Sequence, residues 1–179
     1  MMADKSTIAI RKIGITSAGT QAVVNAANAQ LLQGGGVCGI IFKAAGAHRL
    51  QKECDRIGHC PTGSAVITSG YDLCDYIIHA VGPIYQGGRN NEAKDLYSCY
   101  EKALDLAKEN NISSIAFPLI SSGIYGYPKQ EAFAIALKSC DDWIRKNDDY
   151  QIKIIFAIID DGLIELGEKT ARELGIKTV

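Results

Sequence analysis

The chain has 179 residues, with 19 Lys and Arg against 20 Asp and Glu, which gives a formal net charge of −1. Hydrophobic residues make up 47% and charged residues 22% of the sequence, a balance that excludes a disordered or collagen-like chain. The near-zero charge argues against binding of duplex nucleic acid, because that mode depends on neutralising phosphates with Lys and Arg. The length predicts one domain that spans residues 1–179.

No apolar run comes close to the roughly 20 residues that a membrane helix needs. The longest candidate, Ile152–Ile159, contains Lys153. The segment Met1–Thr7 is polar and lacks the apolar stretch of a signal peptide. We therefore expect a cytoplasmic protein that does not insert into a membrane.

The cysteines show neither a CxxC pair nor a spacing of Cys and His that is typical of zinc sites. Without an export signal they are expected to be reduced thiols. No metal ion and no cofactor is predicted. The cysteines are Cys38, Cys54, Cys60, Cys74, Cys99 and Cys140.

Apolar residues in the first half of the chain predict short strands and one long helix. Ile8 and Ile10 alternate with less apolar neighbours, which is typical of a strand with one covered face. Val37–Ile57 has apolar residues near helical spacing, although Gly39 and Gly46 are unfavourable inside a helix. The predicted strands are Thr7–Arg11, Ala65–Thr68 and Tyr76–Val81, and Gln21–Asn25 is a further strand candidate that carries the short apolar run Ala22–Val24.

The second half of the chain alternates helices with strands. Ser114–Ile120 and Ile152–Ile159 are almost wholly apolar, as strands covered on both faces are. Apolar stripes at helical spacing and end signals define the helices. They are predicted at Glu92–Asn110, from near Pro128 onward, and from Asp160 or Asp161 to Gly175.

This alternation predicts an α/β fold with a largely parallel sheet in three layers. Ligands of such sheets bind beyond the carboxyl ends of the strands, in the loops that follow. Two unusual loops, Asn25–Gly39 and Ser121–Pro128, follow predicted strands. They are the candidates for a binding site.

The first loop carries Gly34–Gly36 directly before a predicted helix. Glycines let the backbone come close to a ligand, and N–H groups at a helix N-terminus bind phosphate. The loop is therefore a candidate phosphate site, although it matches neither a Walker A loop nor GxGxxG. A plain glycine-rich turn is the alternative interpretation.

The second loop contains Ser121, Ser122 and Gly123, with Gly126 three residues further on. Backbone N–H groups there could form a second anion nest that faces the first. Tyr125 could lay its ring against a sugar. An ordinary connection from strand to helix is the alternative.

Four further polar side chains are open to two interpretations. The amides of Asn25 and Asn28 suit ribose hydroxyls, but asparagines also cap turns locally. Cys38 lies at a helix start, where a thiolate would be stabilised; with no His nearby in the sequence, an inert packed thiol is the alternative. His79 is expected to be a satisfied histidine at a strand end rather than a base.

Together these segments resemble the macrodomain family across nearly the whole chain. The motifs occur in the family's order and spacing. They read VVNAAN, LLQGGGVCG, KAAG, CPTGSAVIT, IIHAVGP and FPLISSGIYGYP. The chain is most similar to bacterial single-domain members that act as ADP-ribosyl hydrolases and O-acetyl-ADP-ribose deacetylases.

The resemblance implies a three-layer α/β/α fold with a six-stranded mixed sheet, and ADP-ribose in a cleft at its top. Asn28 matches the asparagine that holds the distal ribose. The expected catalytic positions are Asn28 and Cys38. The expected ligand-binding positions are Gly14, Ile15, Ala26, Asn28, Gly34, Gly35, Gly36, Val37, Ser121, Ser122, Gly123, Ile124, Tyr125, Gly126 and Phe156.

Three positions depart from the family pattern. Gly14 stands where many members have an aspartate that accepts a hydrogen bond from the adenine amino group. Ile159 stands where an aromatic ring stacks on adenine, with Phe156 nearby as a substitute. Cys38 replaces an aspartate that helps catalysis in the bacterial hydrolases, although viral hydrolases carry a small residue there and those of alphaviruses also read G-V-C.

Three functions are therefore compared. The first is hydrolysis of ADP-ribosyl esters on proteins or of O-acetyl-ADP-ribose. The second is binding of ADP-ribose or an ADP-ribosylated protein without turnover, which the loss of the aspartate at Cys38 favours. The third, motivated by Gly14, is binding of another phosphorylated sugar or nucleotide.

Overall fold

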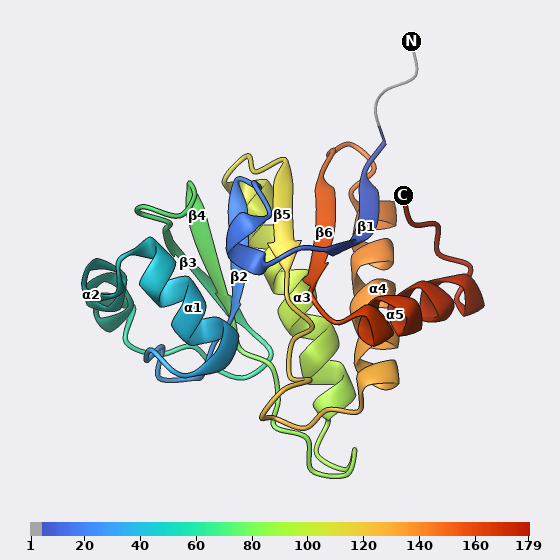
Figure 1. Cartoon of the computed structure of the whole chain (residues 1–179), viewed down its shortest axis with the longest axis horizontal. Helices are drawn as coiled ribbons and strands as arrows, with labels where there is room; N and C mark the ends of the chain where they lie inside the picture. Colours follow the sequence, from blue (N-terminus) through green and yellow to red (C-terminus); the bar gives the residue numbers. More distant parts are fainter. Residues whose placement is uncertain (1–4) are drawn as a thin grey trace.

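The computed structural model describes residues 5–179 and places six strands in one sheet, in the order β1-β6-β5-β2-β4-β3 (Figure 1). β3 pairs antiparallel with β4, and every other neighbouring pair is parallel. The predicted mixed six-stranded sheet is confirmed. The strands are β1 (Thr7–Lys12), β2 (Ala22–Ala26), β3 (Ala65–Ser69), β4 (Tyr76–Ala80), β5 (Ser114–Phe117) and β6 (Lys153–Ile158).

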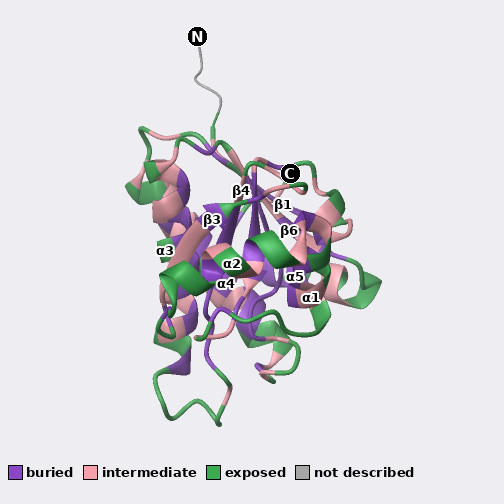
Figure 2. Cartoon of the chain, turned by 90° about the vertical axis from the view of Figure 1, so that its left-hand side faces the viewer, coloured by how far each residue is buried: buried purple, intermediate pink, exposed green. Residues whose placement is uncertain are grey.

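Helices cover both faces of the sheet. Because side chains alternate along a strand, Val24 packs into the core shared with α3, α4 and α5, whereas Val23 packs against α1 and α2. Figure 2 shows exposed outer faces on the helices and buried strands behind them. The three-layer α/β/α arrangement is confirmed. The helices are η1 (Ile15–Ser17), α1 (Gly36–Ala45), α2 (Ala47–Ile57), α3 (Glu92–Glu109), α4 (Lys129–Lys146) and α5 (Asp161–Glu173).

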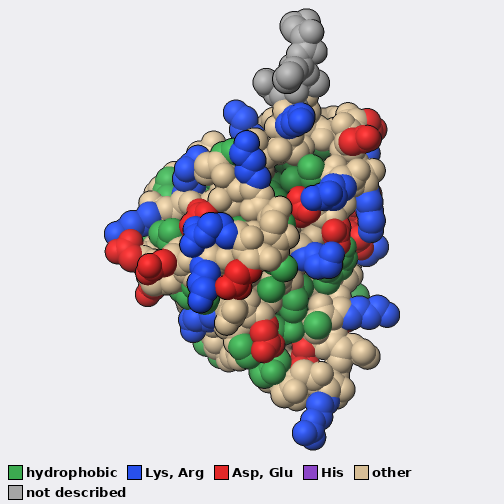
Figure 3. Space-filling view, turned by 90° about the vertical axis from the view of Figure 1, so that its right-hand side faces the viewer, with side chains coloured by type: hydrophobic (Ala, Val, Ile, Leu, Met, Phe, Trp, Pro, Cys, Tyr) green, Lys and Arg blue, Asp and Glu red, His purple; other side chains and the backbone are tan. Residues whose placement is uncertain are grey.

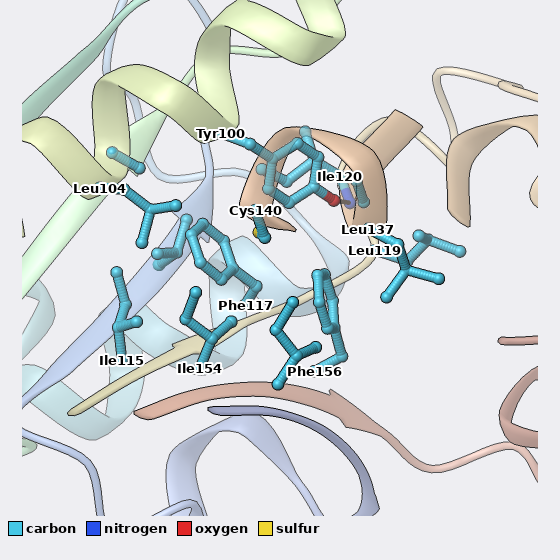
Figure 4. Packing of buried hydrophobic residues seen from close by; sticks show 14 of the residues in the cluster. Tyr100, Leu104, Ile115, Phe117, Leu119, Ile120, Leu137, Cys140, Ile154 and Phe156 are labelled. Carbon is cyan, nitrogen blue, oxygen red and sulfur yellow. Dashed lines mark hydrogen bonds between the residues drawn. The ribbon is translucent and has the colours of Figure 1, made fainter. Parts of the chain in front are cut away.

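Aromatic rings fill the larger of the two cores. The rings of Phe117 and Phe156 stack with centroids 5.8 Å apart, and Tyr100 lies 5.1 Å from Phe117 (Figure 4). Such pairs add about 0.5–1.5 kcal/mol each beyond the burial of their area. They pack β5 and β6 together, two of the strands whose carboxyl ends reach the site described below.

The predicted helix Val37–Ile57 is wrong in one respect, because it is two helices. Gly46 has φ 108°, a left-handed conformation, and its N–H donates to the carbonyl of Phe42 to close α1. A residue with a side chain rarely adopts this conformation. Gly46 therefore ends α1 and starts α2, which the local apolar spacing did not reveal.

Two other element boundaries follow from single residues. The predicted strand Ser114–Ile120 ends at Phe117, because Pro118 has no N–H to donate to a sheet neighbour. The predicted cap of the last helix is confirmed at Asp160, whose carboxylate accepts a hydrogen bond from the N–H of Leu163 at 2.9 Å.

Charges on the surface are mixed. On the side that carries α5, Lys and Arg side chains are interspersed with Asp and Glu (Figure 3). Within residues 5–179 no helix has both the length and the apolar character to cross a membrane. The same part of the chain contains no group of three or more His, Cys, Asp or Glu side chains that could hold a metal ion.

Candidate functional site

A cavity of about 550 Å³ opens at the carboxyl ends of β2, β4, β5 and β6. It lies where ligands of parallel sheets bind, because the loops that leave these strands diverge there. Its first wall is Asn28 with Gly34–Cys38, and its second wall is Ser121–Tyr125. Other lining residues are Ala26, Ala27, Gly82, Pro118, Leu119, Ile120, Ala157, Ile158, Ile159, Asp160 and Leu163.

The first wall is held in shape by Asn28. Its side-chain amide donates to the carbonyl of Leu32 at 2.8 Å, and its side-chain oxygen accepts from the N–H of Leu32 at 3.0 Å. Each amide group can make a further hydrogen bond. Asn28 therefore shapes the loop and can still offer a donor and an acceptor to a ligand.

Cys38 completes the same loop from inside. Its sulfur accepts from the N–H of Gly34 at 3.4 Å and lies 3.9 Å from the carbonyl of Leu32. Gly39 lies so close to this turn that an added Cβ would stand 2.7 Å from the carbonyl oxygen of Gly34. The buried thiol thus faces the loop backbone as well as the cavity, and its visible contacts are structural.

The start of α1 leaves N–H groups free at the first wall. Gly35 caps the helix without a side-chain hydrogen bond, and Gly36 has φ 57°. The first N–H groups of a helix have no partner within the helix, and the helix dipole makes this end positive. The residues concerned, Gly36–Cys38, line the cavity.

The second wall has free N–H groups as well. Ser121 has φ 67°, and the N–H of Tyr127 donates back to its carbonyl at 2.9 Å, which closes the loop on itself. Among residues 5–179, the N–H groups of Gly123, Ile124 and Tyr125 have no hydrogen-bond acceptor. Two sets of free backbone donors therefore border one cavity, the arrangement that binds anionic oxygens.

Charged side chains contribute little to this cavity. No Lys, Arg or His of residues 5–179 lines it, and Asp160, which caps α5, is the lining carboxylate. A bound anion would therefore be neutralised by N–H groups and helix dipoles rather than by cations. This agrees with the near-zero net charge of the chain.

The rim of the cavity is apolar. Ile124 is 95% exposed and Ile159 is 75% exposed, although both line the cavity. These two side chains present apolar surface at the mouth of the cavity. Both can cover a ligand that enters between the walls.

The identity of the chain follows from residues 24–136, which match the family model described as Macro domain. This match covers more than half of the chain. The chain belongs to the macrodomain family.

Relatives and a solved structure agree with this assignment. A macro domain-containing protein of Listeria monocytogenes is 50% identical over 168 residues, which are 90% of this chain and 95% of the relative. Human ADP-ribose glycohydrolase MACROD2 is 51% identical over 146 residues, but these are 80% of this chain and only 34% of MACROD2. A solved structure of the Oceanobacillus iheyensis macrodomain with ADP has 38% identity and a TM-score of 0.87, covering 96% of this chain and 93% of that one.

Most site residues expected from the sequence meet at this macrodomain's cavity. They come from the end of β2, from the segment that follows β2, and from the loop that follows β5. Those that line the cavity are Ala26, Asn28, Gly34, Gly35, Gly36, Val37, Cys38, Ser121, Ser122, Gly123, Ile124 and Tyr125.

Four expected ligand-binding residues lie elsewhere, and Phe156 is the clearest correction. Its ring is fully buried beside Tyr100 and Phe117 (Figure 4) and also contacts Phe133, so it has no surface to offer a base. The reason is the pleat of β6. Phe156 points into the core, whereas the next residue, Ala157, lines the cavity.

Gly14, Ile15 and Gly126 are also outside the cavity lining. Gly14 precedes η1 with φ −69°, and Ile15 is buried in the smaller core. Gly126 has φ 70° and turns the second loop toward α4, with its N–H donating to the carbonyl of Gly123 at 3.0 Å. Of these three residues, Gly126 shapes the macrodomain's second loop.

Residues that the sequence reasoning missed sit at strand ends. Gly82 follows β4, and Asp160 with Leu163 follows β6. The rule that ligands bind beyond the carboxyl ends of parallel strands would have found them, had it been applied to every predicted strand. Only the two glycine-rich loops were singled out.

Asn25 and His79 form a buried pair away from the cavity. The side-chain amide of Asn25 lies 3.1 Å from His79 Nδ1, and the hydroxyl of Thr68 lies 2.9 Å from His79 Nε2. Because the amide nitrogen can only donate, Nδ1 accepts and Nε2 carries the proton. Burial lowers the pKa of His79 to about 4. The interpretation of His79 as a satisfied histidine agrees with these contacts.

Proposed function

We propose that this macrodomain binds ADP-ribose in the cavity and hydrolyses ADP-ribosyl esters on proteins or O-acetyl-ADP-ribose. The observation that carries the proposal is the pair of free N–H sets on opposite walls, at Gly36–Cys38 and Gly123–Tyr125. A bent diphosphate between two sugars presents acceptor oxygens to both walls at once. A single phosphate would leave part of one wall unused.

The two ends of the cavity suit the two ends of the ligand. At one end Asn28 has a spare donor and acceptor for the hydroxyls of the distal ribose. At the other end Ile159 and Leu163 offer apolar surface to the adenine, with Asp160 beside them. The name of MACROD2 as an ADP-ribose glycohydrolase and the ADP in the Oceanobacillus macrodomain support this assignment.

In the proposed reaction, the ester and one water give the carboxylic acid and ADP-ribose, or acetate and ADP-ribose. Water adds to the reacting carbon, the C–O bond to the leaving group breaks, and the leaving oxygen takes up a proton. Asn28 orients the distal ribose, and the two walls hold the diphosphate in place. Orientation of this kind contributes on the order of 7–11 kcal/mol to lowering a barrier.

Cys38 has a supporting part in this scheme. Its thiol cannot act as a carboxylate base, and it packs against the backbone of Gly34 and Leu32. The proton transfers then fall to a substrate phosphate oxygen or to a water held between the walls. The chain's own contribution is to bind the diphosphate between the two walls and to orient the distal ribose at Asn28.

One observation favours a second candidate function. At the Asn28 end, the lining residues of the described chain include no carboxylate and no histidine. A site with donors for ADP-ribose but no base suits a protein that binds ADP-ribosylated partners without turnover.

A turnover assay on a glutamate-linked ADP-ribosylated protein separates the two functions. Wild type and Asn28→Ala are compared, with calorimetry of ADP-ribose binding on both. Release of ADP-ribose by wild type, reduced in Asn28→Ala, supports the hydrolase. Binding without release supports the second candidate, and absence of both contradicts the assignment of the cavity.

A further inference from the structure

A buried carboxylate outside the cavity organises the loop beside it. Glu92 is the first residue of α3 and is only 2% exposed. Its two side-chain oxygens accept from the N–H of Gly88 at 2.5 Å and from the N–H of Asn90 at 2.7 Å. Within residues 5–179 it has no ion pair with Lys, Arg or His. Burying a carboxylate costs free energy unless hydrogen bonds satisfy it. The two backbone N–H groups provide these hydrogen bonds to Glu92.

The loop that Glu92 holds is the segment 82–91, which leaves β4 at the cavity and returns to α3. Its backbone turns sharply, with φ near 80° at Gly87 and Gly88 and 61° at Asn91. Across the turn, the side-chain amide of Asn90 donates to the side-chain oxygen of Gln86 at 2.7 Å, an exposed contact. The hydrogen bonds to Gly88 and Asn90 fasten the two sides of the turn to a single side chain.

The same loop touches the second wall of the cavity. The N–H of Tyr85 donates to the carbonyl of Tyr125 at 2.8 Å. The ring of Tyr85 packs on that of Tyr127, with centroids 4.9 Å apart and planes at 56°. Segment 82–91 therefore contacts the loop 121–127 through the backbone and the ring of Tyr85.

We infer that Glu92 is a positioning residue of the site, acting through Tyr85 on the loop 121–127. Its carboxylate sets the shape of segment 82–91, that shape places Tyr85, and Tyr85 fixes the wall that carries the free N–H groups of Gly123–Tyr125. The inference rests on the proposed function only in naming ADP-ribose as the ligand of that wall. Glu92 itself touches no ligand.

The chemistry of the side chain provides the test. Glu92→Gln keeps the size but replaces one acceptor oxygen with a donor, so one of the two backbone N–H groups loses its partner. Glu131→Gln is the matched control, because Glu131 also lies in the first turn of a helix, α4, but is exposed and holds no loop. Both variants are compared with wild type by calorimetry with ADP-ribose and by amide hydrogen exchange.

The expected result for Glu92→Gln is ADP-ribose binding weaker by about fivefold or more. Amide exchange becomes faster at Tyr85 and in the loop 121–127 as well as at Gly88 and Asn90. Glu131→Gln leaves both unchanged. Faster exchange confined to Gly88 and Asn90, with unchanged affinity, overturns the inference, because it shows a purely local role at the start of α3.

Tyr85→Ala tests the same link if Glu92→Gln does not fold. It removes the ring contact to Tyr127 and leaves α3 intact. Weaker binding and faster exchange in the loop 121–127 support the route through Tyr85, and wild-type behaviour overturns it. If wild type does not bind ADP-ribose, the proposed function fails, while hydrogen exchange still decides whether Glu92 holds the loop.

Discussion

Gly82 lies directly against Ser121. A Cβ on Gly82 would stand 2.3 Å from Ser121 Oγ and 2.5 Å from a methyl carbon of Ile120. The hydroxyl of Ser121 is buried and has no hydrogen-bond partner within the described chain. The segment that follows β4 can therefore approach the second wall this closely only because residue 82 is a glycine.

Gly82→Ala is therefore expected to push the second wall out of place. Overpacking of this kind costs about 1–3 kcal/mol, and we expect ADP-ribose affinity to fall by about tenfold or more. Calorimetry measures it. Gly14→Ala is the control, because nothing lies within 4 Å of its Cβ position and its φ of −69° suits any residue. Equal affinities for wild type and Gly82→Ala would show that the wall tolerates the shift.

Gly14→Asp is expected to strengthen ADP-ribose binding. Gly14 lies outside the cavity lining, but we expect the longer side chain of an aspartate to reach the adenine amino group as an acceptor, and such charge-assisted bonds contribute about 1.5–3 kcal/mol. The backbone at Gly14 is extended and the space around it is open, so the substitution adds no strain. Comparison with Gly14→Asn by calorimetry separates charge from size. Unchanged affinity in Gly14→Asp would place the adenine amino group out of reach of this position.

Asn28→Ala is expected to lower turnover more than Cys38→Ala. In the proposed function Asn28 orients the distal ribose, and its side chain also bridges the backbone of Leu32, whereas Cys38 makes only long sulfur contacts to the loop. Initial rates on an ADP-ribosylated protein measure the difference. Cys38→Asp should keep or raise activity, because a helix N-terminus favours negative charge. Loss of activity in Cys38→Ala alone would assign the chemistry to the thiol.

The free energy of unfolding is expected to fall as pH drops from 6.5 toward 4. Burial lowers the pKa of His79 to about 4, against 6.5 for an ordinary histidine. In this window the unfolded chain binds a proton that the folded chain excludes, so stability rises with pH and is lost on acidification. The change approaches about 3 kcal/mol.

Urea denaturation at several pH values measures this change. His79→Gln retains polar groups for Asn25 and Thr68 but does not titrate, so its stability should depend less on pH in this window. His48→Gln, at an exposed histidine, is the control and should behave like wild type. An unchanged pH dependence in His79→Gln would show that other groups cause the loss.

Local sequence patterns predicted most elements because their causes are local. The carboxylate of Asp160 caps α5 through its neighbour Leu163, and Pro118 ends β5 by lacking an N–H. The apolar spacing did not predict the break between α1 and α2 at Gly46, because that spacing continues across the glycine. Only its left-handed φ of 108° separates α1 from α2.

By itself, the sequence determined the alternation of strands and helices, the two glycine-rich loops and the position of Asn28 in the first of them. Those depend on residues close together in the chain. The tertiary structure decided that Phe156 faces the core while Ala157 and Ile159 face the cavity, and that Gly82 meets Ser121. It also decided that the N–H of Tyr85 donates to the carbonyl of Tyr125. These relationships depend on the pleat of a strand and on the approach of segments far apart in the chain, which sequence spacing does not encode.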